Sequence, residues 1–467
     1  MTRIDDLAKQ YPAIPRELIL KWELWNRGIN DTDDIDKISK WVPAEGTYQN
    51  KFDEVSLKER VTRRPSRLKD GRILRPNYSN ACMTKKTIAA PIVLSKDTPY
   101  EFREFGDGKF AFFEGEEKVD IDLYFPQPKA REGAEPVTSK GTPISRLLLS
   151  PRNCFVIMPV RHCEYFGVGE QCKFCNFNTG QEEIRALGLG RPATENLDET
   201  VEAYKIRSSE VRLVEGRFEL GGFANSENEE RIHTSFVERI ANAAPYKPFL
   251  LIHTEALTRK GMQRLKDVGL DSVTIQLEVW DPQVFAEMCP GKVKHMSYQA
   301  WLDSINDAVD IFGVGNVACK TIGGTSLVAE SGHKTWQEAR DTHIEHIREM
   351  CSIGAIPSLG CLRLPVGSVW GGDPSLREKL PPTEYYLDLF GPHHEAMTEH
   401  GLYDKLNKFM YCGFDCAQTV YCGDIGIFER AGDWGHWMAD VVPDKANWLL
   451  QWLAEIESPV EVKAKAQ

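Results

Sequence analysis

The sequence has no long apolar run, no excess of positive charge and no repeated or low-complexity segment. No stretch approaches the roughly 20 apolar residues that a membrane-spanning helix requires. Acidic residues near the N-terminus stand where a secretory signal would place its apolar segment. The 57 basic side chains are outnumbered by 69 acidic ones, which disfavours a nucleic acid or an anionic membrane as the main partner. We therefore expect a soluble, cytoplasmic protein.

The length of 467 residues predicts more than one compact unit. Residues 1–145 carry a helical pattern, RELILKWELWNRG, followed by the strand-like segments KTIAAPIVL, KFAFFEGE and KVDIDLYF. A polar segment rich in proline, glycine and lysine then indicates a linker. We expect an N-terminal α+β accessory region over 1–145, a central domain over 146–370 and a helical C-terminal region over 371–467.

The central domain alternates short apolar runs with amphipathic helical stretches. Such strand–helix units pair in parallel through right-handed crossovers. Six units predict an α/β fold with a partial (β/α)6 barrel, since a closed barrel of this kind has eight. The six predicted strands are Cys154–Val160, Arg217–Gly222, Phe249–Thr254, Ser272–Glu278, Val317–Gly323 and Ile356–Leu364.

Twelve cysteines in a protein of a reducing compartment require an explanation other than structural disulfides. Isolated cysteines are usually small buried apolar residues, and this is what we expect for Cys82, Cys154, Cys289, Cys319, Cys351 and Cys361. The other six form two groups, Cys163, Cys172 and Cys175, and Cys412, Cys416 and Cys422. Grouped thiols indicate metal binding or catalysis.

The first group has the spacing C-x8-C-x2-C and begins just after the first predicted barrel strand. Two thiolates separated by two residues can converge on one metal centre, and a third can reach it from a loop that contains glycine. Cys154 lies at the other end of the strand, about 20 Å away. Three thiolates suit an iron–sulfur cluster with one open iron, because structural zinc requires four ligands and only His162 is near. Structural zinc and chance clustering remain alternatives.

With this motif and barrel pattern, the chain resembles the radical S-adenosylmethionine (SAM) enzymes, and within them the biotin-synthase-like branch. The resemblance covers residues 150–370. The first gap of the motif is commonly three residues in that superfamily, whereas here it is eight. The resemblance implies that Cys163, Cys172 and Cys175 hold a 4Fe–4S cluster that binds SAM.

The resemblance also implies a role for residues of the first four barrel units. Phe174 stands where an aromatic side chain packs near adenine. Gly221 and Gly222 stand where a glycine pair lets the backbone approach the methionine amino group, although a tight turn alone would explain them. Glu278 resembles the polar residue that meets the ribose or methionine moiety, and capping of a neighbouring helix is its alternative role.

Two later segments complete the implied SAM site. Gly323 and Gly324, in KTIGGTSLVAE, resemble the glycines that pass under the adenine. Leu364 and Pro365, in CLRLPVGS, resemble the residues whose backbone closes around adenine. The segment CPGK at 289–292 is also typical of this branch, but no role follows for Cys289.

The resemblance implies an enzyme that reductively cleaves SAM to a 5′-deoxyadenosyl radical, which abstracts hydrogen from an unactivated carbon. It implies a one-electron donor such as flavodoxin or ferredoxin as a partner. We expect a small-molecule substrate, since a barrel mouth covered by extra domains encloses a cavity. A peptide substrate is one alternative, and a non-catalytic barrel that binds zinc or an iron–sulfur cluster is another. No residue is selected as catalytic, and no oligomeric state is predicted.

The second group, Cys412, Cys416 and Cys422, has the spacing C-x3-C-x5-C. Glycines directly after the first and third of these cysteines would let the backbone wrap a compact ligand. We expect a second, auxiliary iron–sulfur cluster here. A zinc site and three buried thiols are the alternatives.

Overall fold

Six parallel strands form one sheet in the order β11–β12–β13–β14–β15–β16. In this computed structural model, the described residues are 1–38, isolated strand segments between 66 and 91, and, with short gaps, 93–405. The barrel strands are β11 (Cys154–Val160), β12 (Glu215–Leu220), β13 (Phe249–Thr254), β14 (Ser272–Glu278), β15 (Val317–Gly323) and β16 (Ile356–Cys361). Every neighbouring pair is parallel, so all six carboxyl ends meet at one edge.

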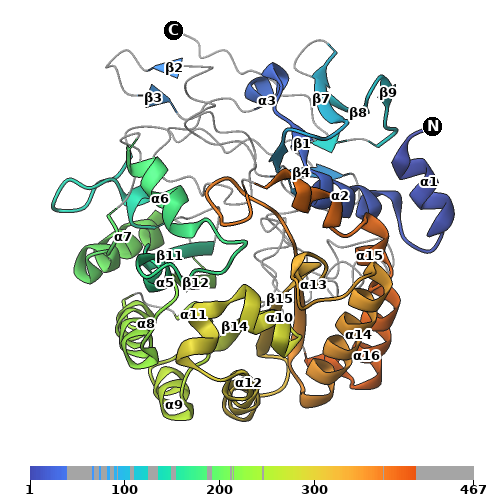
Figure 1. The fold of residues 1–467 in the computed structure, drawn as a ribbon. Coiled ribbons are helices and arrows are strands. Elements are labelled where there is room, and N and C mark those ends of the chain that lie inside the picture. The colour runs from blue at the N-terminus through green and yellow to red at the C-terminus, as the bar shows by residue number, and fades with distance from the viewer. Residues whose placement is uncertain are drawn as a thin grey trace, which may run out of the picture.

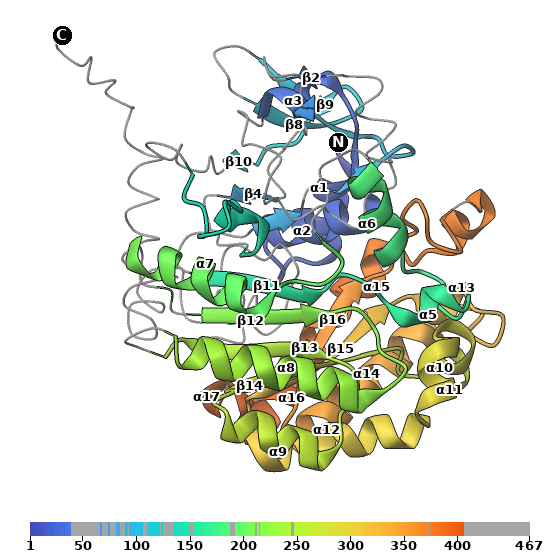
Figure 2. The ribbon, with the colours of Figure 1, turned by 90° about the vertical axis from the view of Figure 1, so that its left-hand side faces the viewer.

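Helices connect these strands and cover the outside of the sheet (Figure 1). Figure 2 shows α7, α8 and α9 along this outer face, with the N-terminal segments above the sheet. Their bounds are α5 (Glu164–Gly167), α6 (Phe177–Ala186), α7 (Leu197–Glu210), α8 (Ser226–Ala241), α9 (Arg259–Asp267), α10 (Pro282–Met288), α11 (Pro290–His295), α12 (Tyr298–Phe312), α13 (Thr325–Val328) and α14 (Trp336–Ile353). The chain then continues through α15 (Thr383–Leu387), α16 (Phe390–Glu399) and α17 (Leu402–Lys405), with 3-10 turns η1 (Ile144–Arg146) and η2 (Pro374–Lys379).

Apolar side chains from the strands and helices form the core of the barrel. Phe155 on β11 packs against Phe218 on β12 and against Tyr204 on α7, with ring centroids 6.4 and 5.0 Å apart. Gly216 makes room for this packing, since a Cβ atom there would stand 2.1 Å from the Phe155 ring. Any larger residue at 216 would therefore displace the Phe155 ring from this packing.

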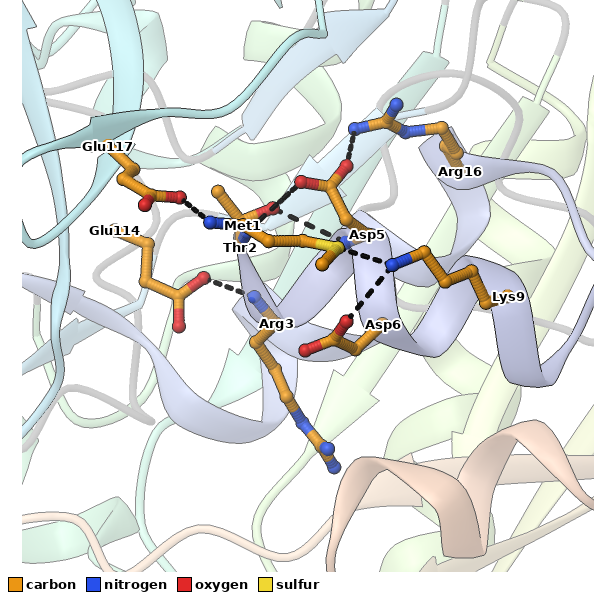
Figure 3. Close-up of polar contacts among 9 residues, drawn as sticks. All are labelled: Met1, Thr2, Arg3, Asp5, Asp6, Lys9, Arg16, Glu114 and Glu117. Atoms are coloured by element: carbon orange, nitrogen blue, oxygen red, sulfur yellow. Dashed lines mark hydrogen bonds and ion pairs between the residues drawn. The ribbon is translucent and has the colours of Figure 1, made fainter.

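The N-terminal region begins with α1 (Arg3–Gln10), α2 (Arg16–Arg27) and α3 (Asp33–Ile38). Short strands follow: β1 (Ile29–Asn30), β2 (Ser66–Arg67), β3 (Ile73–Leu74), β4 (Ala81–Thr84), β5 (Ala89–Pro91), β6 (Leu94–Ser95), β7 (Tyr100–Glu104), β8 (Phe110–Glu114), β9 (Glu117–Lys118) and β10 (Leu123–Tyr124). Thr2 starts α1 with a capping box, in which its hydroxyl accepts from the Asp5 N–H and the Asp5 carboxylate accepts from the Thr2 N–H (Figure 3). The Arg3 N–H donates to Glu114 at 2.5 Å, which fixes α1 against β8.

Helix α2 packs against the end of the barrel rather than forming a separate core. The Trp22 ring stacks on Trp25 of the same helix and on Tyr386 of α15, with centroids 5.2 and 4.9 Å apart. The buried Glu23 carboxylate accepts hydrogen bonds from the hydroxyls of Tyr100 and Thr383. Burial raises the pKa of Glu23, and these two hydrogen bonds oppose that rise. Apolar and polar contacts thus join α2 to α15, which lies about 360 positions later in the chain.

The predicted α/β partial barrel of six units is confirmed. Four predicted strands have the bounds that the structure shows, while β12 is shifted two residues towards the N-terminus and β16 ends at Cys361, three residues early. The predicted N-terminal helix corresponds to α2. In the C-terminal region the expected helices are present as α15, α16 and α17, and residues 406–467 lie outside the described part of the chain. No helix in the described ranges is both long and apolar enough to span a membrane.

Three buried histidines on helices α14 and α16 predict that the free energy of unfolding depends on pH. His343 and His346 are on α14 and His393 is on α16. Burial lowers the pKa of all three below 6.5, to about 4 for His343 and His393. Between pH 6.5 and 4 the unfolded chain therefore binds protons that the folded chain does not. Each group then stabilises the fold fully above about pH 6.5 and loses this contribution as the pH falls, at up to about 1.4 kcal/mol per pH unit.

We expect His346→Leu to lose stability less steeply than the wild type between pH 6.5 and 5. His346 lies against the Trp280 ring with 4.7 Å between centroids, so leucine keeps an apolar contact and removes one titrating group. Urea unfolding at several pH values measures the free energy of unfolding of both proteins. Carboxylates that titrate in the same range contribute equally to both, so the difference between the two slopes reports His346. His400→Leu, at a half-buried position, is the control. Equal slopes for His346→Leu and the wild type would contradict the assignment.

Candidate active site

A cavity of about 1130 Å³, including its open mouth, lies at the carboxyl ends of the barrel strands. This edge is where ligands usually bind in parallel α/β folds. The wall combines apolar side chains with charged ones. The apolar part includes Trp25, Met158, Phe174, Phe177, Leu220 and Ile322, and the charged or titratable part includes Glu219, Glu229, His253, Glu255, Glu278, Lys292 and Lys320.

All three thiols of the C-x8-C-x2-C motif line this cavity. Cys163 follows β11 by three residues and starts α5, whereas Cys172 and Cys175 lie in the next loop, where the Cys175 N–H donates to the Cys172 carbonyl at 2.9 Å. Burial, together with the nearby Cys175, raises the pKa of Cys163 to about 12. A positively charged metal centre would reverse this effect and bind the thiolate. The structure therefore brings together three cysteines that span 13 positions of sequence.

Asn178 and the glycine pair fix the start of the cysteine loop. The Asn178 side chain accepts from the Cys163 N–H at 2.7 Å and donates to the Cys163 carbonyl at 2.9 Å. A Cβ atom at Gly221 would stand 2.0 Å from the His162 carbonyl oxygen, and one at Gly222 would stand 3.1 Å from the Cys163 sulfur. Both glycines line the cavity, and their lack of side chains is what lets the loop pass so close to β12.

A buried lysine is the centre of the charged part of the wall. Lys292 donates to the Gln276 carbonyl at 2.6 Å, and its Nζ is 3.4 Å from Glu278 Oε1 and 3.7 Å from Glu255 Oε1. Burial opposes the charged form, but the carboxylates of Glu278 and Glu255 outweigh it and raise the pKa of Lys292. The ammonium also lies over the Trp301 ring at 4.8 Å. Lys292 is thus held as a cation in an enclosed site.

Glu255 connects this lysine to the cysteine loop. Its Oε2 accepts from the Tyr165 hydroxyl at 2.7 Å and from the Phe223 N–H at 3.2 Å. Burial raises the pKa of Glu255 to about 7, with Lys292 acting against the rise and Glu229 adding to it. A carboxyl group with this pKa can hold or release a proton near neutral pH.

A polar floor crosses four adjacent strands inside the cavity. Glu219 of β12 and His253 of β13 are cross-strand partners, with 3.6 Å between Oε1 and Nδ1. Gln276 of β14 and Lys320 of β15 also line the cavity. These side chains extend inwards because alternate residues of a strand face the same side of the sheet.

Glu278 has an unusual backbone conformation at the end of β14. Its φ is +71°, and among the described residues no other non-glycine residue has a positive φ. The pairing of β14 with β15 also shifts its register between Ile275 and Glu278. Such a conformation costs about 1–3 kcal/mol and is typical of functional sites. In this strained conformation the Glu278 side chain forms its ion pair with Lys292.

The other residues selected from the sequence fall into two groups. Phe174 and Pro365 line the cavity, whereas Leu364 is buried next to it and does not appear in the wall. Gly323 and Gly324 also lie outside the wall: Cβ atoms there would stand 2.9 Å from the Tyr386 ring and 2.5 Å from the Pro381 ring. The structure thus shows these two glycines packed against the segment that enters α15. Their predicted contact with adenine stays a prediction.

Sequence reasoning missed much of the wall, including Trp25, Tyr165, Glu255 and Lys292. Glu255 directly follows β13, so the rule that functional residues follow the carboxyl ends of parallel strands could have selected it. Lys292 stands in CPGK, a segment noted for its resemblance to the branch without a role for the lysine. Trp25 comes from α2, outside the barrel, and no local pattern indicates its position.

The residues present fit an iron–sulfur cluster with three protein ligands. Their residues come from the segment between β11 and α6, and all three line one cavity whose free volume a further ligand could fill. In the described parts of the chain, no group of three His, Cys, Asp or Glu side chains is close enough to hold one metal ion. A four-iron cluster does not require this closeness, because each thiolate binds its own iron atom. The predicted second site at Cys412, Cys416 and Cys422 lies outside the described residues.

The chain forms a partial (β/α)6 barrel, and three thiols lie at its mouth. This is the arrangement that the resemblance to radical SAM enzymes predicted. No protein-family model matches the chain. Among curated proteins it is similar to the bacteriochlorophyllide c C-7(1)-hydroxylase of Chlorobaculum limnaeum, with 24% identity over 241 residues, 47% of this chain and 55% of the relative. The chain thus spans about half the length of that relative.

Solved structures with a similar course include methylornithine synthase, with a TM-score of 0.38, 12% identity and coverage of 54% of this chain and 64% of that chain. Another is coproporphyrinogen III oxidase from Escherichia coli, described as a radical SAM enzyme, with a TM-score of 0.33, 11% identity and 55% coverage of both chains. TM-scores of this size carry no argument about activity. The predicted resemblance to radical SAM enzymes is confirmed as a resemblance. An activity has to be argued from the residues of the site.

The Lys292 network predicts a large stability effect at one lysine and a small one at its neighbour. Lys292→Met should lower the free energy of unfolding by about 3–5 kcal/mol, because it leaves two buried carboxylates without their cation. Lys294→Met is the matched control: Lys294 is exposed, and its ion pair with Glu170 should contribute less than about 1 kcal/mol. Urea unfolding measures both. Similar small losses in the two variants would show that Lys292 does not neutralise the site.

Proposed function

We propose that this protein is a radical SAM enzyme that activates an unreactive carbon of a small-molecule substrate. The observation that carries the proposal is the placement of Cys163, Cys172 and Cys175 around one cavity at the carboxyl edge of a six-stranded partial barrel. These thiolates would hold a 4Fe–4S cluster, and SAM would occupy the adjoining cavity. When bound, the cluster and SAM supply a 5′-deoxyadenosyl radical, which removes a hydrogen atom from the substrate.

The charged wall suits a ligand that carries a positive group. The Lys292 ammonium is paired with both Glu255 and Glu278, so two carboxylates share one cation and can also meet an ammonium group or a ribose hydroxyl. The SAM methionine moiety contains such an amino group. Phe174, in the same wall, offers an aromatic face for a base.

The substrate would bind against the polar floor and under Trp25. Trp25 is 3% exposed and reaches the cavity from α2, where its carbonyl oxygen accepts from the buried Arg363 side chain at 3.2 Å. Trp25 thus gives the cavity an apolar wall, and Glu219, His253, Gln276 and Lys320 give it a polar one. This enclosure favours a small molecule, since it excludes water and fixes the orientation of the reacting carbon. Carbon hydroxylation, named for the Chlorobaculum limnaeum relative, is one net reaction of this kind.

The three thiols predict an all-or-none requirement for SAM cleavage. Cys163→Ala, Cys172→Ala and Cys175→Ala should each abolish it, because a cluster with three protein ligands has no spare one. Cys154→Ala is the control, since Cys154 begins β11 at the opposite end of the strand. Anaerobic reconstitution, iron analysis and measurement of 5′-deoxyadenosine after reduction with SAM test this. Full activity of Cys163→Ala, or its loss in Cys154→Ala, would contradict the assignment.

The same experiment separates the enzyme from a non-catalytic barrel. Brown protein with about four or more iron atoms per chain, forming 5′-deoxyadenosine on reduction, supports the proposal. Colourless protein with stoichiometric zinc and no SAM cleavage would support a structural metal site instead. A flavodoxin or ferredoxin should replace the chemical reductant.

We further propose an auxiliary cluster at Cys412, Cys416 and Cys422, supported by their spacing and adjacent glycines. Replacing all three with alanine should remove about four iron atoms per chain and leave substrate-free SAM cleavage unchanged, since the barrel loop is separate. The Cys163/Cys172/Cys175 triple alanine variant is the complement, because it should keep only this second cluster. If that variant folds but contains no iron, the second group consists of buried thiols or a zinc site.

A further inference from the structure

Trp25 reaches the cavity from a helix more than 100 residues before the barrel, and its ring belongs to a stack of aromatic side chains. Trp25 and Trp22, both on α2, are stacked with 5.2 Å between ring centroids and 24° between ring planes. Trp22 is stacked in turn on Tyr386 of α15, at 4.9 Å and 12°. The three rings thus lead from the cavity wall into the core that joins α2 to α15.

The far end of this stack is fixed to the barrel itself. The Tyr386 hydroxyl donates to the carbonyl of Gly323 on β15 at 3.1 Å and accepts from the Leu362 N–H at 3.4 Å. Trp22 and Tyr386 are both fully buried. Because closely packed side chains have little room to move, Trp22 gives the Trp25 ring a rigid support.

The backbone around Trp25 is fixed as well. Trp25 and Asn26 are among the last four residues of α2, whose carbonyl groups have no partner inside the helix. Arg363 donates from Nη1 to these two carbonyl oxygens, at 3.2 and 2.5 Å. The Asn26 side chain donates to the Pro381 carbonyl at 3.0 Å and to the Thr383 hydroxyl at 3.2 Å. Trp25 is therefore held in place before any ligand binds, and binding does not have to order it.

We propose that Trp25 is a substrate-contacting residue whose indole stacks on a flat, conjugated ring of the substrate and selects substrates of that class. The inference rests on the proposed function and names the class of its small molecule. Trp22 covers one face of the Trp25 ring, which leaves the opposite face for the cavity. A stacked pair of flat rings gains affinity beyond the apolar area that it buries, by up to about tenfold.

The composition of the wall favours a flat ring of the substrate over the adenine of SAM. Phe174 lies between two of the cysteines, so an aromatic face for adenine is present without Trp25. A merely apolar substrate would need no flat wall, since Met158, Leu220 and Ile322 already supply apolar surface. A fixed indole from a helix outside the barrel adds a planar surface to both.

The test uses two probes of matched skeleton. The first is 2-naphthol, a flat fused ring, and the second is decahydro-2-naphthol, its saturated counterpart with the same hydroxyl group. Isothermal titration calorimetry on the full-length, anaerobically reconstituted protein measures the Kd of each. The Kd of 5′-deoxyadenosine, which carries the adenine ring of SAM, is measured in parallel.

Three variants are compared with the wild type. Trp25→Leu removes the ring, and Trp25→Phe keeps a smaller one. Trp336→Leu is the matched control, because Trp336 is a half-buried tryptophan at the start of α14 and does not line the cavity. Circular dichroism checks that each variant is folded.

We expect the wild type to bind 2-naphthol several-fold more tightly than decahydro-2-naphthol, by up to about tenfold. Trp25→Leu should lose this preference, Trp25→Phe should keep part of it, and Trp336→Leu should match the wild type. All four proteins should bind 5′-deoxyadenosine with the same Kd.

Several results would overturn the inference, and they differ in meaning. A wild type that does not bind 2-naphthol or does not prefer it, or an unchanged preference in Trp25→Leu, would show that Trp25 does not select a flat ring. If Trp25→Leu does not fold, an unchanged preference in Trp25→Phe would show the same. A Trp25→Leu protein that loses as much affinity for 5′-deoxyadenosine as for 2-naphthol would assign Trp25 to the SAM site. Wild-type protein without iron and without SAM cleavage would contradict the proposed function itself, which the affinities for the two naphthols do not test.

Discussion

The contact between the loop after β11 and the glycine pair after β12 is the constraint on which the candidate site depends. Gly221 and Gly222 leave so little space that any side chain at either position would collide with the His162 backbone or approach the Cys163 thiol. Asn178 holds the same loop from the other side through two hydrogen bonds. Because the loop is fixed here, Cys163 faces the cavity, and the following residues return with Cys172 and Cys175.

The electrostatics of the site follow from enclosing several charges in a small space. Lys292 of α11 pairs with Glu255, which follows β13, and with Glu278 at the end of β14. Tyr165 connects Glu255 to the cysteine loop. Removing these groups from water is costly unless they pair. The arrangement neutralises itself only in part, since two carboxylates share one ammonium. That residual charge and the raised pKa of Glu255 give the cavity the capacity to bind a ligand with a positive group or to hold a proton.

The sequence predicted the parts of this structure that depend on local pattern. Apolar runs of six or seven residues located β11, β13, β14 and β15 with their observed bounds, because each run is buried on both faces of a parallel sheet. The end of β16 was placed too late, since the apolar residues continue beyond Cys361 into a loop that is also buried. The cysteine motif placed three thiols at the carboxyl edge for the same local reason.

Contacts between distant segments could not be predicted in this way. Glu255 and Lys292 are separated by 37 positions, and Trp25 reaches the cavity from a helix more than 100 residues before the barrel. Gly323 and Gly324 were assigned from resemblance, yet the aromatic residues of α15 and Pro381 lie against them. Only the folded chain shows which residues share a wall.

The central claim is that the three thiols between β11 and α6 leave one iron of a cluster open to SAM. Mössbauer spectroscopy of protein reconstituted with ⁵⁷Fe, recorded with and without SAM, tests it most directly. We expect one iron of four to change its spectrum when SAM binds, while the three irons bound to thiolates keep theirs. A cluster whose irons all stay unchanged at saturating SAM would contradict it.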